Sequence, residues 1–177
     1  MRYILTVVSV VILSFSSAPA SAATQQEQSS RILNELGHRC LDAAWEGIGG
    51  NGTRVQLWDC YGPGQLNQQW YFRNPDPSDP LATQIVNKAS GRCLDATYQS
   101  GGVNGTPLQL WDCYGPGQLN QIWYLDYAHP YVNMIIRSKM YRRVADAAWQ
   151  WQGANGTPVQ LWDFYGVDRT NQRWGLH

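Results

Sequence analysis

Three groups of polar and aromatic side chains recur at matching spacings along this chain. Each group holds an aspartate, a glutamine two residues before a tryptophan, and an adjacent Asn-Gln pair. The groups are Asp42, Gln56, Trp58, Asn67 and Gln68; Asp95, Gln109, Trp111, Asn120 and Gln121; and Asp146, Gln160, Trp162, Asn171 and Gln172. A carboxylate accepts hydrogen bonds, an amide both donates and accepts them, and an indole offers a flat apolar surface. Such a set suits a ligand that has one apolar face and a rim of hydroxyl groups.

The glutamine and tryptophan of each group lie in a short apolar segment that predicts a β-strand. Side chains alternate across a strand, so Gln56 and Trp58 share one face while Val55 and Leu57 share the other. The apolar pair must face the core, which leaves an indole beside an amide on the opposite face. A pyranose ring fits this surface, because its C–H face suits the indole and its hydroxyls suit the polar groups. One such tryptophan would be explained by packing beneath a loop, but three at the same strand position favour a ligand platform.

A second aromatic residue follows each aspartate by three positions. These residues are Trp45, Tyr98 and Trp149. They either wall the pocket, or extend it to a second sugar ring, or simply pack against their own loops. The tryptophans of the closing Asn-Gln-x-Trp motif, by contrast, are expected in the core: Trp70, Trp123 and Trp174.

The spacing of the three groups shows that the chain repeats one unit three times, with a period of about 50 residues. Short apolar segments broken by Gly, Pro and Asn-Gly predict strands and tight turns. Three units of about four strands bury a common core if they close around one axis, which also removes open sheet edges. We therefore expect an all-β domain with pseudo-threefold symmetry over residues 32–177, in repeats 32–80, 81–129 and 130–177.

An Asn-Gly-Thr triplet precedes the Gln-Leu-Trp strand in every repeat, at Asn51, Asn104 and Asn155. The triplet is a glycosylation sequon, but its recurrence with the repeat favours a turn in which glycine adopts a positive φ.

The four cysteines lie at matching positions in the first two repeats. Of three connectivities, the repeat favours Cys40–Cys60 and Cys93–Cys113. The third repeat has Val144 and Phe164 instead, a joint replacement that we expect if the two positions touch in the interior. Zinc is disfavoured, because the spacing is not Cys-x-x-Cys and no His accompanies the cysteines. We predict no metal site and no cofactor.

The order Cys-Leu-Asp, Gln-Leu-Trp and Asn-Gln-x-Trp resembles the ricin B-chain type lectin family, whose domains are β-trefoils. The resemblance covers about residues 32–177. It implies that the Asp, the Gln, the aromatic residue and the Asn-Gln pair of each repeat contact sugar, of galactose or xylan type. The third repeat departs from the pattern between Gly166 and Thr170, which alters its loop. Three sites on one chain would act together by avidity on a dense glycan.

Two other functions are alternatives to sugar binding by a lectin. A glycoside hydrolase needs paired carboxylates, but alternation turns Asp59 away from the face of Trp58, and Asp59, Asp112 and Asp163 are expected to be structural. The histidines at 38, 129 and 177 share no repeat position, so we predict no catalytic residues. Protein recognition, as a protease inhibitor or as the targeting subunit of a toxin with a separate active subunit, is the main alternative.

The composition and the N-terminus indicate where the chain acts. Formal net charge is +0, which disfavours nucleic acid as a partner, and the basic group Arg137, Lys139, Arg142 and Arg143 is expected to be a solvated face. Residues 1–22 predict a secretory signal peptide, with an apolar segment too short to span a membrane, and residues 23–31 a flexible lead-in. We therefore expect a secreted, extracellular protein.

Overall fold

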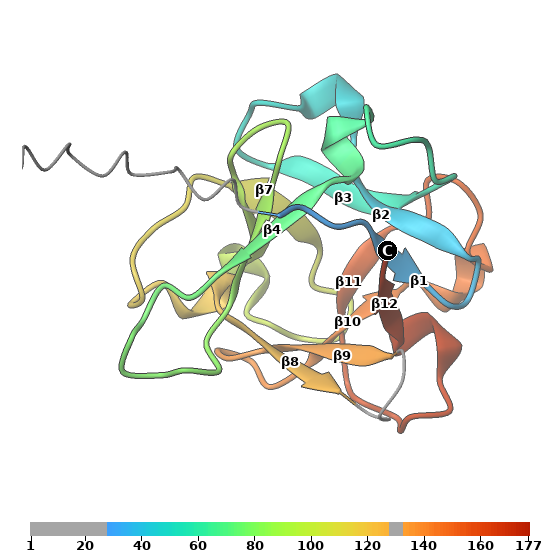
Figure 1. The fold of residues 1–177 in the computed structure, drawn as a ribbon. Helices are drawn as coiled ribbons and strands as arrows, with labels where there is room; N and C mark the ends of the chain where they lie inside the picture. Colours follow the sequence, from blue (N-terminus) through green and yellow to red (C-terminus); the bar gives the residue numbers. More distant parts are fainter. Residues whose placement is uncertain (1–27, 128–132) are drawn as a thin grey trace, which may run out of the picture.

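The computed structural model describes residues 28–127 and 133–177, which form twelve short β-strands and six single-turn 3₁₀ helices (Figure 1). The strands are β1 (Ile32–Asn34), β2 (Arg39–Ala43), β3 (Thr53–Trp58), β4 (Trp70–Arg73), β5 (Gln84–Asn87), β6 (Cys93–Ala96), β7 (Leu108–Trp111), β8 (Trp123–Tyr127), β9 (Met134–Ser138), β10 (Val144–Ala147), β11 (Val159–Trp162) and β12 (Trp174–Leu176). The helices are η1 (Trp45–Gly47), η2 (Leu66–Gln68), η3 (Tyr98–Ser100), η4 (Leu119–Gln121), η5 (Trp149–Trp151) and η6 (Thr170–Gln172). Each predicted repeat holds four strands, which confirms the expected all-β architecture.

Six strands close into a barrel in the order β1, β4, β5, β8, β9, β12. Antiparallel ladders join β4 to β5, β8 to β9, β9 to β12 and β12 to β1. Two isolated bridges complete the ring. Ser30, which precedes β1, pairs with Trp70 of β4, and Thr83, which precedes β5, pairs with Trp123 of β8. Every barrel strand therefore has a partner on both sides, so the barrel has no open edge.

The other six strands form three hairpins, β2–β3, β6–β7 and β10–β11, one in each repeat. Their second strands also pair with one another. Thr53 of β3 pairs with Leu110 of β7, and single bridges join β3 to Pro158 and β11 to Pro107. The hairpins thus meet in a ring of three, which is the pseudo-threefold closure that the repeats predict.

A polar contact between successive repeats, which we call the inter-repeat clasp, holds this ring. Asn51 of the first Asn-Gly turn donates from Nδ2 to Asp112 Oδ2 at 2.9 Å, and its Oδ1 accepts from the Asp112 amide at 2.8 Å. Arg92 donates to the same Oδ1 at 2.9 Å and forms an ion pair with Asp112 at 3.2 Å. The other two clasps consist of Asn104 with Asp163 and Arg143, and Asn155 with Asp59 and Arg39. The prediction that this second aspartate of each repeat is structural is confirmed.

The clasp explains the recurring Asn-Gly-Thr triplet. The glycines have φ of 88°, 90° and 84° at Gly52, Gly105 and Gly156, as expected for a turn that only glycine adopts without strain. Each asparagine amide is already bonded to the neighbouring repeat, and each threonine of the triplet is buried. The triplet is therefore a turn and clasp motif in the folded chain.

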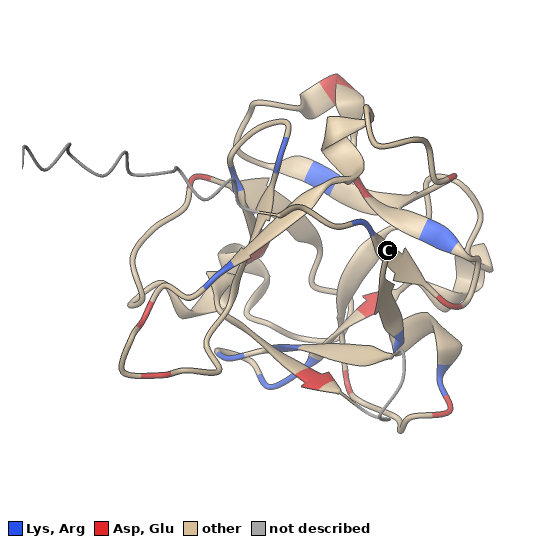
Figure 2. Cartoon of the chain, viewed as in Figure 1, with Lys and Arg blue, Asp and Glu red and all other residues tan. Residues whose placement is uncertain are grey.

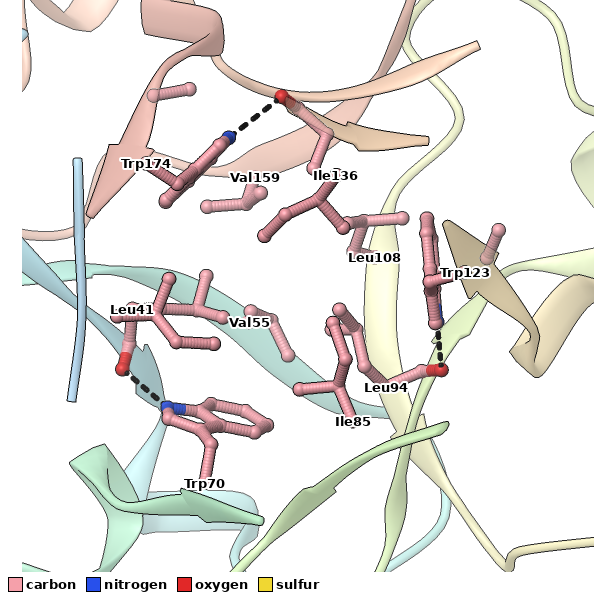
Figure 3. Close-up of a cluster of buried hydrophobic side chains, with 14 of the residues drawn as sticks. Leu41, Val55, Trp70, Ile85, Leu94, Leu108, Trp123, Ile136, Val159 and Trp174 are labelled. Atoms are coloured by element: carbon pink, nitrogen blue, oxygen red, sulfur yellow. Dashed lines mark hydrogen bonds between the residues drawn. The ribbon is translucent and has the colours of Figure 1, made fainter. Parts of the chain in front are cut away.

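Three indoles surround the apolar core, as Figure 3 shows. Trp70, Trp123 and Trp174 are fully buried, and their N–H groups donate to the carbonyls of Leu41 and Leu94 at 3.0 Å and of Ala145 at 3.1 Å. The apolar residues of the hairpin strands pack between them, which confirms that the closing tryptophans belong to the core. Since every buried indole N–H has a partner, the core carries no unpaired donor from these rings.

Both predicted disulfides are present, Cys40–Cys60 and Cys93–Cys113. In the third repeat, Val144 is buried, but Phe164 is 36% exposed and lies under the guanidinium of Arg137 at 5.3 Å. The expectation that both replacements lie in the interior is therefore wrong for Phe164, whose ring is partly exposed and packs against an arginine.

Charged residues are scattered singly around the chain, as Figure 2 shows. In the basic group, Arg137 pairs with Asp126 at 2.7 Å, Lys139 with Asp79 at 2.8 Å and Arg143 with Asp163 at 2.9 Å. Its charge is thus largely neutralised.

Within the described residues no helix has the length and apolar character needed to cross a bilayer. The predicted signal peptide, most of the lead-in and the boundary between residues 129 and 130 lie outside the described residues.

Candidate functional site

Strand pairing brings the first members of each group together on the outer face of a hairpin. Asp42 lies directly opposite Gln56, Asp95 opposite Gln109, and Asp146 opposite Gln160. Residues in such pairs share a face, and the tryptophan two residues after each glutamine lies on that face too. We call the three resulting groups the first, second and third sites, in chain order.

The tryptophans of the three sites lie outside the core. Trp58, Trp111 and Trp162 are half-buried, whereas the leucine before each of them, as in Leu57, is fully buried. The alternation expected from the sequence is present in all three hairpins, and it leaves an indole surface open beside the aspartate.

A 3₁₀ helix carries the Asn-Gln pair of each repeat back to its aspartate. In the first site, Asp42 Oδ2 accepts from Asn67 at 2.9 Å and from Gln68 at 3.0 Å, while Oδ1 accepts from Gln56 at 3.1 Å. The second site repeats this arrangement at 2.9, 3.0 and 3.0 Å, and the third at 2.7, 2.9 and 3.2 Å. The three predicted amides of each group thus surround its carboxylate, and the tryptophans of the second and third sites line the same hollows as Asp95 and Asp146.

The second glutamine of each site lies behind the aspartate. Gln121 is fully buried, donates to Asp95 and to the Asp112 carbonyl at 2.9 Å, and accepts from the Tyr114 amide at 3.0 Å. Gln68 and Gln172 make the matching bonds. Because both ends of this amide are occupied, its geometry is that of a support for the carboxylate.

The three site aspartates are buried carboxylates held by amides alone. Burial raises the pKa of Asp42, Asp95 and Asp146 above the ordinary 3.8, and the hydrogen bonds from the three amides oppose that increase. Glu46 adds a further increase to the pKa of Asp42 by charge repulsion. The amides orient each carboxylate, and none of them supplies a neutralising charge.

The second and third sites open into hollows of about 190 and 240 Å³. The second is lined by Asp95, Tyr98, Gln99, Gln109, Trp111, Tyr114, Gln118 and Asn120. The third is lined by Asp146, Trp149, Gln150, Gln160, Trp162, Tyr165, Arg169 and Asn171. Tyr98 and Trp149 thus lie in the walls and are more than half exposed, as is Trp45 in the first repeat. Between these aromatic walls, the lining groups of each hollow include the carboxylate, with four amide side chains in the second hollow and three in the third.

Several lining residues were missed from the sequence. Tyr114 and Tyr165 follow the Trp-Asp pair by two positions in each repeat, so their recurrence was a usable signal. Gln118 and Arg169 come from the segment before η4 and η6, and only the fold-back of that segment brings them to the hollow.

Two buried acceptors of the first site are unused within the described residues. These are Gln56 Oε1 and Asn67 Oδ1, which flank Asp42. In the second site the matching atom of Asn120 accepts from Gln118 at 2.7 Å. The first site therefore differs from the second in its pairing of buried acceptors.

Within residues 28–127 and 133–177, no three His, Cys, Asp or Glu side chains lie close enough to hold a metal ion. The second aspartate of each repeat belongs to a clasp, where Asp59 accepts from Asn155 and Arg39.

Comparison with known proteins identifies the fold and the family. A family model described as ricin-type β-trefoil lectin domain-like matches residues 66–162, more than half of the chain. Comparison with curated protein sequences finds no significant match.

Solved structures show the same architecture. A designed threefold-symmetric protein, ThreeFoil, has a TM-score of 0.71 at 20% identity, over 84% of this chain and 96% of its own. The Macrolepiota procera ricin B-like lectin in complex with lactose has a TM-score of 0.65 at 20% identity, over 88% and 98% of the two chains. An exo-β-1,3-galactanase from Clostridium thermocellum has a TM-score of 0.71 at 26% identity, over 86% of this chain but only 30% of the galactanase. With its twelve-stranded trefoil and threefold Gln-x-Trp sites, the chain belongs to the ricin-type β-trefoil lectin domain-like family.

Proposed function

We propose that this protein is a secreted lectin that binds carbohydrate at up to three sites, one in each repeat. The observation that carries the proposal is the same assembly found three times: a half-buried indole beside a carboxylate whose oxygens are held by three amides. A flat apolar surface next to oriented hydrogen-bond acceptors is the arrangement that a pyranose requires.

Each member of a site has a distinct role in this proposal. The apolar face of a sugar ring stacks on Trp58, Trp111 or Trp162. The adjacent aspartate accepts from two sugar hydroxyls, and these charge-assisted bonds provide most of the orientation. The strand glutamine and the asparagine add further polar contacts at the rim.

The buried glutamine of the Asn-Gln pair has a positioning role instead of a direct contact. Gln68, Gln121 and Gln172 fix the carboxylate from behind, since their amides are fully used within the protein. Tyr98, Trp149 and, by equivalence, Trp45 form the outer wall of each site.

Galactose- or xylan-type glycans are the proposed ligands. The Macrolepiota lectin was solved with lactose, and an earthworm R-type lectin of the same fold was solved with GalNAc. Single exposed sugar sites bind weakly, so three sites on one rigid body would act by avidity. The two disulfides fit the extracellular location expected from the signal peptide.

We infer that the domain binds glycans without cleaving them. Two structures of similar fold are glycosidases, the Clostridium thermocellum galactanase and a Clostridium perfringens endo-β-galactosidase, but this chain matches only 30% and 32% of them. Within each repeat, the aspartate that follows the site tryptophan (Asp59, Asp112 or Asp163) is occupied in a clasp, so it is not free to act as the second carboxylate of a hydrolase.

Retention on immobilised galactose and xylan, with elution by free sugar, tests the proposal. Replacing Trp58, Trp111 and Trp162 singly by alanine should reduce retention in steps, and the triple variant should pass through the column. Trp151 is a matched control, because it is 51% exposed and does not line the hollows of the second and third sites.

W151A should be retained like the unmodified protein, and circular dichroism should show the same fold for all variants. Unchanged retention of the triple variant would refute the site assignment. Sugar-independent retention on a protein partner would instead favour a protein-recognition function.

A further inference from the structure

The three sites share one framework but differ in charge at two rim positions. The first position lies four residues after the site aspartate and holds Glu46, Gln99 or Gln150. The second lies two residues before the site asparagine and holds Gln65, Gln118 or Arg169. In the second and third sites, both positions line the hollow. The third hollow therefore has a guanidinium at a position where the second hollow has a neutral amide.

Arg169 is placed to contact a ligand in the third site. It lines the hollow together with Asp146, Trp149 and Trp162, and its guanidinium lies 5.9 Å from the centre of the Tyr165 ring. Stacking on a tyrosine limits the mobility of the guanidinium and leaves its N–H donors available.

The guanidinium of Arg169 has no carboxylate partner within 4.0 Å in the part of the chain that the structure describes. This contrasts with Arg39, Arg92 and Arg143, each of which is paired in a clasp. Asp146 shares the hollow but is already held by three amides.

The first site differs from the third in both rim positions. Glu46 lies in η1, is exposed, and acts on Asp42 by charge repulsion. The position equivalent to Arg169 is the neutral Gln65. The exposed Arg54 lies on the same face of β3 as Gln56 and Trp58 and offsets the charge of Glu46, so these groups carry the same net charge as Asp95 gives the second site.

We propose that the third site recognises an acidic sugar, bearing a carboxylate or a sulfate, through Arg169. This inference rests on the proposed lectin function. A guanidinium binds either anion through paired N–H donors, whereas the glutamine of the other sites offers only a neutral amide. One chain would then bind both the neutral and the charged residues of a mixed polysaccharide.

Binding is measured at each site separately from the indole N–H resonance of Trp58, Trp111 or Trp162 in ¹H–¹⁵N spectra, assigned with single Trp→Phe variants. The probes are two matched pairs, D-xylose with D-glucuronate and D-galactose with D-galacturonate, together with D-galactose 6-sulfate. Glucuronate differs from xylose by one ring carboxylate, so the affinity ratio within a pair isolates the charge.

At low salt, the ratio of acidic to neutral affinity should be about threefold to tenfold higher at Trp162 than at Trp111. R169Q, which installs the second-site residue, should reduce it to the Trp111 value. R142Q, an exposed arginine outside the hollows, should change neither ratio, and added salt should lower the preference at Trp162.

Equal ratios at Trp111 and Trp162, or no change in R169Q, would overturn this inference and leave the lectin proposal intact, provided that neutral sugars shift the three indoles. If neither neutral nor acidic sugars shift any of them, the lectin proposal fails and the inference fails with it. A preference for the sulfate alone supports the inference and identifies the anion.

Discussion

The inter-repeat clasp should contribute a large and equal share of stability at all three junctions. Asn155 closes the ring between the third and first repeats with three hydrogen bonds of 2.7 Å: to Asp59 Oδ2, from the Asp59 amide and from Arg39 Nε. A neutral hydrogen bond contributes about 1 kcal/mol, and solvent screening reduces each of the two partly exposed charge-assisted bonds to about 0.5–1 kcal/mol. The change Asn155→Ala should therefore cost about 2–3 kcal/mol of unfolding free energy. For a domain of this size that corresponds to a fall in Tm of about 4–10 °C.

The assay is equilibrium unfolding in guanidinium chloride with thermal unfolding alongside it. N51A and N104A should match N155A, because their bonds are equivalent. N74A is the control, since Asn74 bonds only within its own loop, to the Asp79 carbonyl and the Asp76 amide. The triple clasp variant should lose about 6–9 kcal/mol, comparable to the whole stability of many domains, and should not fold at 37 °C. If N155A costs no more than N74A, the clasp does not hold the repeats together.

Three further predictions follow from the same structure. The double variant C93A/C113A should lose about 3 kcal/mol of unfolding free energy, because the disulfide closes a loop of 20 residues. An unchanged denaturation midpoint would refute a stabilising role for this disulfide. Sugar retention should be complete at neutral pH and should fall as the pH drops toward the raised pKa values of Asp42, Asp95 and Asp146, because protonation removes the anionic acceptor. Retention that persists unchanged down to pH 3.8 would contradict the raised pKa of these aspartates. W70F should cost about 2–3 kcal/mol of unfolding free energy, because it removes buried volume and the donor to the Leu41 carbonyl, whereas W58A should cost about 1 kcal/mol or less. Equal decreases in Tm for the two variants would contradict the burial of Trp70.

The grouping of Asp, Gln and Trp could be predicted from the sequence because it depends on local geometry. Alternation along β3 places Gln56 and Trp58 on one face, and the hairpin register places Asp42 opposite Gln56. The threefold repeat then multiplies a weak signal, since a feature that recurs three times at one position is hard to attribute to chance. The disulfides and the core tryptophans were predictable for the same reason.

Features that depend on chain segments far apart were not predictable in this way. The burial of Gln121 behind Asp95 follows from the return of η4 onto β6, which no local pattern encodes. The bond between Asn51 and Asp112 joins two repeats and appears only after the hairpins close into a ring. The exposure of Phe164 was not predictable, because its alignment with Cys60 shows only an equivalent position along the chain. Its ring packs against Arg137, a contact that the alignment does not indicate.

Crystallisation of the protein with a saturating concentration of galactose or xylobiose would show directly where sugar binds. We expect a sugar ring stacked on Trp58, Trp111 or Trp162, with two hydroxyls within hydrogen-bonding distance of the neighbouring Asp42, Asp95 or Asp146. Sugar bound elsewhere on the surface, with all three of these indoles uncovered, would contradict this expectation.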